Sequence, residues 1–202
     1  YKIEQLVICY NLFMVRPARL NDFSQIKYIK DTLALDVAEI STKEYRFKVQ
    51  KEGFLLKSPT TEESFQNDLH KIFLIGEQDD VCVGYIRVDE IPEISRDTGI
   101  FWLRPELEES YFTLPHACIG GLGILQEGRG IGLAKELLRQ TEEKVKAKET
   151  SYIFSFVVLS PVTNTASILF HEKNGFERAA TTFPRKLFEM EGYQSILYCK
   201  KI

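Results

Sequence analysis

The chain has 202 residues, of which 44% are hydrophobic and 27% are charged, and its formal net charge is −3. This length suits one domain, and the composition is ordinary for a globular protein. Nucleic-acid binding would need a clustered basic face, and nothing in the composition suggests one, so we expect no nucleic-acid partner.

The N-terminal end is apolar, but it is too short to cross a membrane. Residues 5–15 contain Asn11 and lack both a basic start and a cleavage site, so we expect neither a membrane anchor nor a signal peptide. Met14 is a second plausible translation start. We therefore interpret residues 1–13 as an N-terminal extension and 14–202 as the functional domain.

The four cysteines do not form any CxxC pair, and three of them lie in apolar runs. This usage predicts buried free thiols in a reducing, cytoplasmic protein. A catalytic cysteine would need an exposed setting and a nearby base, and no feature of the sequence requires one.

The first half of the chain predicts strands at 14–17, 72–76 and 81–89, the last two joined by a turn at 78–80. Asn21 or Asp22 is positioned to cap a helix with apolar residues at helical spacing up to Val37. Residues 41–70 should be helical and loop-like, with Thr60 or Thr61 as an N-cap, at a place where a substrate lid could sit. Residues 90–114 read as irregular, either a substrate-facing loop or a packed insertion.

The second half gives a stronger pattern. It predicts strands at 116–124, 152–159, 176–181 and 195–200, and helices at about 130–148 and 163–174. The run 152–159 is rich in apolar, β-branched and aromatic residues, which is typical of a buried central strand. Gly175 should end the second of these helices. The alternation predicts an α/β sheet with helices on both faces.

A glycine-rich turn joins the strand at 116–124 to the following helix. Gly128, Gly130 and Gly132 remove Cβ atoms that would keep a ligand away from the main chain. The first amides of the helix are unpaired and the helix dipole adds positive charge, so the turn suits a pyrophosphate, with Arg129 at its edge. A glycine turn that only permits tight packing is the structural alternative.

A second motif follows the buried strand, running from Asn164 to Phe176. Together with Glu127-Gly128-Arg129-Gly130-Ile131-Gly132, it resembles the GNAT superfamily of N-acetyltransferases. The family's cofactor motif is [R/Q]-x-x-G-x-[G/A], and its downstream motif is roughly N-x-x-[A/S]-x-x-[L/F]-[Y/H]-e-K-x-G-F. The resemblance covers residues 14–200 and is most specific over 116–176. It implies a mixed, mostly antiparallel sheet with a splay between the two central strands.

The resemblance also implies which residues bind acetyl-CoA as co-substrate. Turn amides would hold the pyrophosphate, and they belong to Gly128, Arg129, Gly130, Ile131 and Gly132. The backbone of Leu122 or Ile124 would pair with the pantetheine arm. Asn164 would contact the cofactor arm, although it is also suited to a plain helix N-cap. Glu127 stands where the family usually has Arg or Gln, so we expect its side chain to point away from the phosphates.

His171 occupies the position where many members carry a Tyr that protonates the departing thiolate. Imidazole can donate or relay a proton near neutral pH; a helix residue that shapes the pocket is the alternative. The sequence does not single out a general base. Many relatives use an acid on or near the central strand, but residues 117–124 contain none. His116 and Glu90 are candidates, and a water chain is a third. The three histidines show no ligand spacing, so no metal is expected.

The resemblance thus implies direct attack of an amine on the thioester in a ternary complex, with a small-molecule or peptide amine as acceptor. A different acyl donor or a hydroxyl acceptor is an alternative within enzymes. A non-catalytic acyl-CoA-binding regulator on the same fold and a nucleotide-binding module are alternatives from other classes. The family also allows a homodimer.

Overall fold

The computed structural model describes residues 13–91, 99–113 and 116–202. Its strands are β1 (Met14–Pro17), β2 (Ile72–Gln78), β3 (Val81–Ile91), β4 (Ile100–Trp102), β5 (His116–Ile124), β6 (Tyr152–Ser160), β7 (Glu177–Thr182), β8 (Arg185–Leu187) and β9 (Met190–Lys201). Its α-helices are α1 (Phe23–Leu33), α2 (Lys43–Glu52), α3 (Glu62–Asp68), α4 (Glu106–Thr113), α5 (Leu133–Lys146) and α6 (Thr165–Lys173). Short 3-10 turns lie at η1 (Leu20–Asp22), η2 (Glu39–Ser41) and η3 (Gln126–Gly128).

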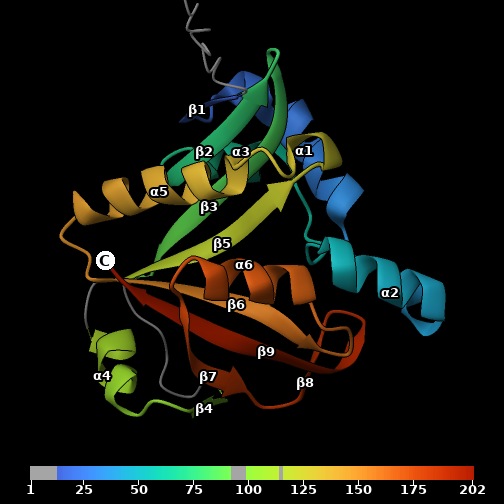
Figure 1. Cartoon of the computed structure of the whole chain (residues 1–202), viewed down its shortest axis with the longest axis vertical. Helices are drawn as coiled ribbons and strands as arrows, with labels where there is room; N and C mark the ends of the chain where they lie inside the picture. The colour runs from blue at the N-terminus through green and yellow to red at the C-terminus, as the bar shows by residue number, and fades with distance from the viewer. Residues whose placement is uncertain (1–12, 92–98, 114–115) are drawn as a thin grey trace, which may run out of the picture.

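The strands form one sheet in the order β1-β2-β3-β5-β6-β9-β7-β4, with β8 paired to β9 (Figure 1). β5 and β6 pair in parallel, and all the other described neighbours pair antiparallel. The two parallel strands lie at the centre of the sheet, and the chain returns from β5 to β6 through α5. The predicted mixed, mostly antiparallel sheet is confirmed.

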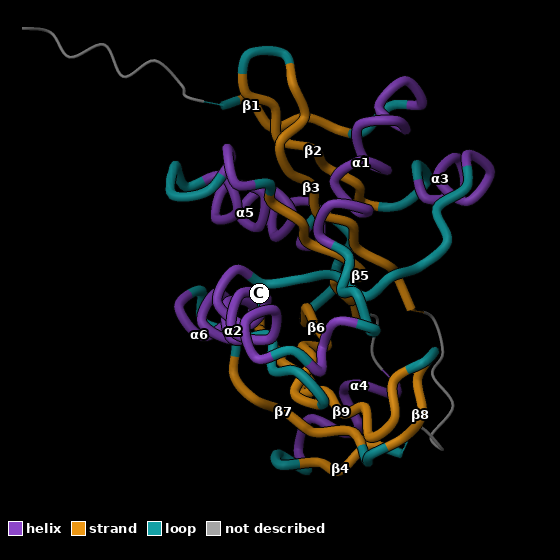
Figure 2. Tube along the Cα trace, turned by 90° about the vertical axis from the view of Figure 1, so that its right-hand side faces the viewer, coloured by secondary structure: helices purple, strands orange, loops and turns teal. Residues whose placement is uncertain are grey.

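Helices cover both faces of the sheet, and alternate strand residues explain how (Figure 2). Leu74 and Ile86 point to one face, where they belong to the core cluster that includes Leu137 of α5. Phe73 and Tyr85 point to the other face and join Ile26 of α1. The period of two along each strand therefore separates two apolar layers, and each layer is closed by its own helices.

The start of the fold is fixed by charge as well as by apolar packing. Arg16 of β1 forms an ion pair with Asp22 at 2.8 Å and a second one with Glu77 of β2. Asp22 is buried, and its carboxylate also accepts a hydrogen bond from the Arg19 amide at 2.7 Å. The pKa of Asp22 is lowered despite burial, which by itself would raise it, because the Arg16 guanidinium favours the ionised form.

Several predicted boundaries differ from the structure. Residues 99–113 are not irregular: they form β4 and α4, which pack their aromatic side chains against β5 and β6. β8 was not predicted, and β9 begins at Met190 rather than at 195. The expectation for residues 1–12 lies outside the described residues. No helix in the described part of the chain is long and apolar enough to cross a membrane.

Candidate active site

The two central strands part from one another halfway along their length. β5 and β6 are paired from His116↔Tyr152 to Ile119↔Ser155, and no pair joins them beyond that point. β5 continues along β3 as far as Gly84↔Ile124, while β6 continues along β9 to Ser160. The predicted splay is therefore present, and Ile119 and Ser155 mark its apex.

The splay exposes main-chain groups of β5. Leu125 N donates to Val83 O at 2.8 Å, so this opposed pair is hydrogen-bonded across the strands. In an antiparallel ladder the hydrogen-bonded pairs alternate with pairs whose N–H and C=O groups point away from the partner strand. Leu122 and Ile124 are at those alternate positions, and their amides and carbonyls face the side that β6 has left. These are the two residues that the sequence offered for pairing with an extended ligand.

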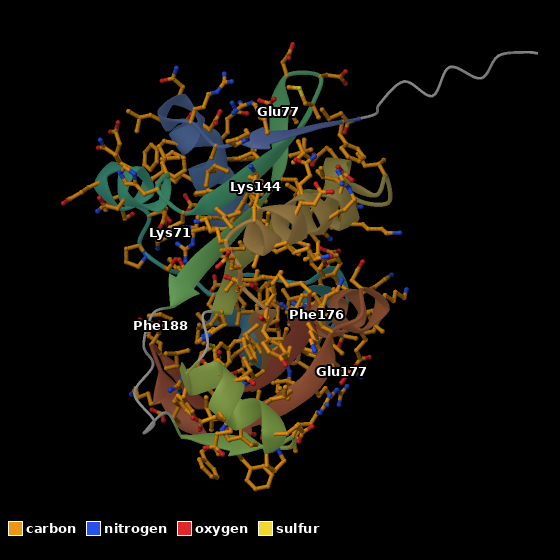
Figure 3. The ribbon with its side chains drawn as sticks, turned by 90° about the vertical axis from the view of Figure 1, so that its left-hand side faces the viewer. Lys71, Glu77, Lys144, Phe176, Glu177 and Phe188 are labelled. Atoms are coloured by element: carbon orange, nitrogen blue, oxygen red, sulfur yellow. The ribbon has the colours of Figure 1, made fainter. Side chains whose placement is uncertain are left out.

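A cavity of about 690 Å³ opens at the splay. Its walls come from α1, the loop at 53–58, β5, β6, α6 and the β8–β9 hairpin. Figure 3 shows Phe188 of that hairpin and Lys71 on one side of the sheet, and Phe176, which follows α6, on the other. The predicted lid region thus contributes the 53–58 loop to the cavity wall, whereas residues 99–113 do not line it.

The glycine-rich turn lies at the open end of β5. Gly130 and Gly132 have φ angles of 76° and 87°, values that favour glycine, and a Cβ added at either would meet nothing within 4 Å. Gly132 is the N-cap of α5, which begins at Leu133. The predicted start near Gly130 was three residues too early, because the chain is left-handed at both glycines. Open space therefore lies in front of the first turn of the helix.

Gly128 has a different role from the other two glycines. It is buried, and an added Cβ would lie 3.0 Å from Val83 Cγ2 and 3.1 Å from Ile124 Cγ2. The packing explanation therefore holds for Gly128. Arg129 lines the cavity, and its Nε donates to the Ile124 carbonyl at 3.1 Å. Glu127 is exposed.

His171 lies on α6, and it is buried and lines the cavity. Its Nε2 is 2.8 Å from Ser155 Oγ, and its Nδ1 is 2.7 Å from the Ser167 carbonyl. The ring stacks on Tyr198, with the centroids 5.3 Å apart. Burial lowers the pKa of His171, and the hydrogen bond to Ser167 opposes this effect.

His116 is not brought to this cavity. It stands at the start of β5, where its ring stacks on Tyr111 with centroids 4.9 Å apart and meets Phe154 edge-on at 5.2 Å. The ring is buried in this aromatic cluster and does not line the cavity. Glu90, the other candidate base, pairs with Ala117 across β3 and β5, and its side chain lies outside the described residues.

Two polar groups at the splay were missed by sequence reasoning. Ser155 is one, although a lone serine inside the apolar run of β6 was a usable signal. The other is the ion pair of Arg87 with Asp89, at 3.0 Å, whose side chains lie above Gly120. A Cβ at Gly120 would lie 2.1 Å from Asp89 Oδ2 and 2.6 Å from Arg87 Nη2. Gly120 is also the unpaired residue of a β-bulge, since Arg87 opposes Gly121 and Val88 opposes Ile119.

Within residues 13–91, 99–113 and 116–202, no three His, Cys, Asp or Glu side chains are grouped so that they could hold a metal ion.

Comparison with protein families places residues 34–176, more than half of the chain, within a family described as the acetyltransferase (GNAT) family. No curated protein matches the chain by sequence.

Solved structures with the same fold include an N-acetyltransferase from Staphylococcus aureus Mu50, with a TM-score of 0.62, 19% identity, and coverage of 94% of this chain and 98% of that one. Arabidopsis thaliana Naa50 in complex with the bisubstrate analogue CoA-Ac-MVNAL gives a TM-score of 0.63, 16% identity, and coverage of 95% and 99%. The PaiA N-acetyltransferase from Thermoplasma acidophilum in complex with coenzyme A gives 0.58, 17%, and coverage of 94% and 99%. Identities this low establish the fold alone.

Proposed function

Since this chain belongs to the acetyltransferase (GNAT) family, we propose that it transfers an acetyl group from acetyl-CoA to a primary amine by direct attack in a ternary complex. The observation that carries the proposal is the splay of β5 and β6, which opens onto a glycine turn with free space in front of it. The splay would take an extended thioester arm, and the turn would take the diphosphate at its end.

The diphosphate is assigned to the amides of the turn from Gly128 to Gly132. At Gly130 and Gly132 an added Cβ would meet nothing within 4 Å. This open space would let a diphosphate reach the main-chain amides. The partial positive charge at the start of α5 favours the same ligand. Arg129 adds a guanidinium beside the cavity.

The pantetheine arm is assigned to Leu122. Both Leu122 and Ile124 face the splay, but the Ile124 carbonyl already accepts a hydrogen bond from Arg129 Nε. Leu122 is also nearer to the apex that Ile119 and Ser155 mark, and the acetyl group would lie beside that apex. Main-chain amides at this apex would polarise the thioester carbonyl as negative charge develops on its oxygen.

The acceptor is assigned to the part of the cavity between α1, the 53–58 loop and the β8–β9 hairpin. Its wall includes apolar side chains such as Leu33, Phe54 and Phe188, together with Lys30 and Arg87. A small-molecule amine or a peptide amine would fit this mixed wall. The likeness to Naa50, solved with an analogue that joins CoA to a peptide, is the reason to include peptide N-termini among the candidates.

The cellular setting stays a prediction. Cys82, Cys118 and Cys199 are buried free thiols, which suits a reducing compartment such as the cytoplasm. A homodimer also stays a prediction.

The test is release of the free CoA thiol from acetyl-CoA by the full chain, measured over a panel of amino acids, polyamines and peptide N-termini. We expect release that depends on an added amine, with the acetylated amine found by mass spectrometry. Tight CoA binding without turnover on any amine would instead support a non-catalytic acyl-CoA sensor. Turnover with longer acyl donors or with alcohols would redefine the donor or the acceptor.

A further inference from the structure

Ser155 and His171 form a buried polar pair at the apex of the splay. Ser155 is 3% exposed and His171 is 2% exposed, yet both line the cavity. The Oγ–Nε2 distance of 2.8 Å is that of a good hydrogen bond. Since Ser155 is the last residue of β6 that pairs with β5, its hydroxyl lies where the two strands separate.

The direction of this hydrogen bond follows from the other side of the ring. His171 Nδ1 is 2.7 Å from the Ser167 carbonyl, and a carbonyl oxygen only accepts, so Nδ1 carries the hydrogen. In the neutral ring Nε2 is then an acceptor, and Ser155 Oγ must donate to it. Ser167 Oγ, 3.4 Å from Nδ1, is a more distant neighbour on the same side.

The surroundings of His171 keep it neutral and in place. Its ring is held between Tyr198, stacked at 5.3 Å, and Phe176, edge-on at 5.0 Å. The Tyr198 hydroxyl donates to Glu172, which lies next to His171 on α6. Glu172 also forms an ion pair with Arg178 of β7 at 2.7 Å. The charges of Glu172 and Arg178 are therefore paired with each other. The largest influence on the pKa of His171 is desolvation by burial, which lowers it.

We propose that the Ser155 hydroxyl is the catalytic group that meets the reacting atoms, and that His171 stores the proton behind it. This inference rests on the acetyl transfer proposed above. Nε2 of His171 is bonded to the Ser155 hydroxyl and Nδ1 to the Ser167 carbonyl, so a proton from the substrate would reach the imidazole through the hydroxyl. His171 is thus a positioning residue in the sense that it acts through Ser155.

The proposed relay balances over one turnover. As the amine nitrogen bonds to the acetyl carbon, its N–H proton passes to Ser155 Oγ, and the original Ser155 proton passes to His171 Nε2. The C–S bond then breaks, and the electron pair leaves with the sulfur. Nε2 returns its proton to Ser155, which delivers one to the thiolate. The products are the amide and the free thiol, and both side chains end as they began.

Three variants test this relay in the full chain: Ser155→Ala, His171→Gln and the double variant. Gln offers an acceptor oxygen but cannot store a proton. We expect each single variant to lower kcat at least tenfold, in line with the size of general acid–base effects, with acetyl-CoA affinity unchanged within twofold. Because the two residues act as a unit, the double variant should lose no more than the worse single variant.

The pH profile separates a proton relay from a merely structural role. With one acceptor amine used throughout, kcat of the wild type should fall on the acid side as His171 becomes protonated, and this limb should disappear in Ser155→Ala. Thr141→Val is the matched control, because it removes another buried hydroxyl, bonded to the Leu137 carbonyl at 2.8 Å, that does not line the cavity. Its kcat and pH profile should equal those of the wild type.

The relay is overturned if Ser155→Ala keeps the wild-type kcat and acid limb, or if the losses in the double variant are additive. It is also overturned if mass spectrometry of peptide digests finds an acetyl group on Ser155 without an amine, since the serine would then be a nucleophile. Those outcomes leave acetyl transfer standing. Failure of the wild type to release thiol with any amine would contradict the proposed function itself.

Discussion

The side chain of Asn164 joins the start of α6 to the main chain of Phe54. Its Nδ2 donates to the Phe54 carbonyl at 2.9 Å, while its Oδ1 accepts from the Ser167 amide at 3.2 Å. One residue therefore caps the helix that carries His171 and anchors the 53–58 loop that forms part of the cavity wall. The sequence suggested either an N-cap or a cofactor contact, and the N-cap is present.

Two substitutions of Asn164 separate these two contacts. Asn164→Ser keeps an N-cap oxygen but cannot reach Phe54, so it should destabilise the fold by about 1 kcal/mol. Asn164→Ala loses both contacts and should destabilise by about 2 kcal/mol. Urea denaturation measures both values. We also expect a higher KM for the acceptor in both variants, and wild-type stability for Asn164→Ser would contradict the assigned contact.

Gly120 should tolerate a methyl group poorly while the ion pair above it is intact. Gly120→Ala would place a Cβ 2.1 Å from Asp89 Oδ2, and this carboxylate is held by both Arg87 and Lys71. We expect a loss of about 1–3 kcal/mol, as for other cases of overpacking. In an Asp89→Ala background the same change should cost less, because the nearest clashing atom is absent. A double-mutant cycle by thermal unfolding measures the difference, and simple additivity would refute the proposed clash.

His171 should make the fold less stable in mild acid. Its folded pKa is lowered by burial, so the unfolded chain takes up a proton at a higher pH than the folded chain does. The stability is therefore complete above the unfolded pKa, about 6.5, and is lost as the pH falls from there toward the lower folded value. In His171→Phe this part of the pH dependence should be absent. Denaturant unfolding at pH 7.5 and pH 5.5 measures this change in the free energy of unfolding. An equal change in the wild type and in His171→Phe would contradict the assignment.

The elements that the sequence predicted best are those with a strong local signal. β1, β5 and α6 match their expected positions closely, and Gly175 ends α6 with a φ of 80°. Thr61 caps α3, as one of the two expected residues, by accepting from the Ser64 amide at 3.1 Å. In each case the pattern of apolar residues and the terminating residue agree, so packing did not have to override local preference.

The errors arose where long-range packing decides the structure. The aromatic stretch at 99–113 lacks a clear period, yet Trp102, Tyr111 and Phe112 form a cluster that closes one layer of the core. His116 belongs to the same aromatic layer, which no local pattern indicates. Ser155 and His171 are 16 positions apart on different elements, and only the packing of α6 on β6 brings them together.

Binding of coenzyme A to the glycine turn is the central claim, and calorimetry tests it most directly. Gly130→Val strains a residue with a φ of 76° and fills the approach to the turn, whereas Gly192→Val imposes a comparable strain at a φ of 65°, also with nothing within 4 Å, on the β8–β9 hairpin. We predict that the wild type and Gly192→Val bind coenzyme A equally and that Gly130→Val binds at least tenfold more weakly. No heat with the wild type, or equal affinity in all three proteins, would contradict the account.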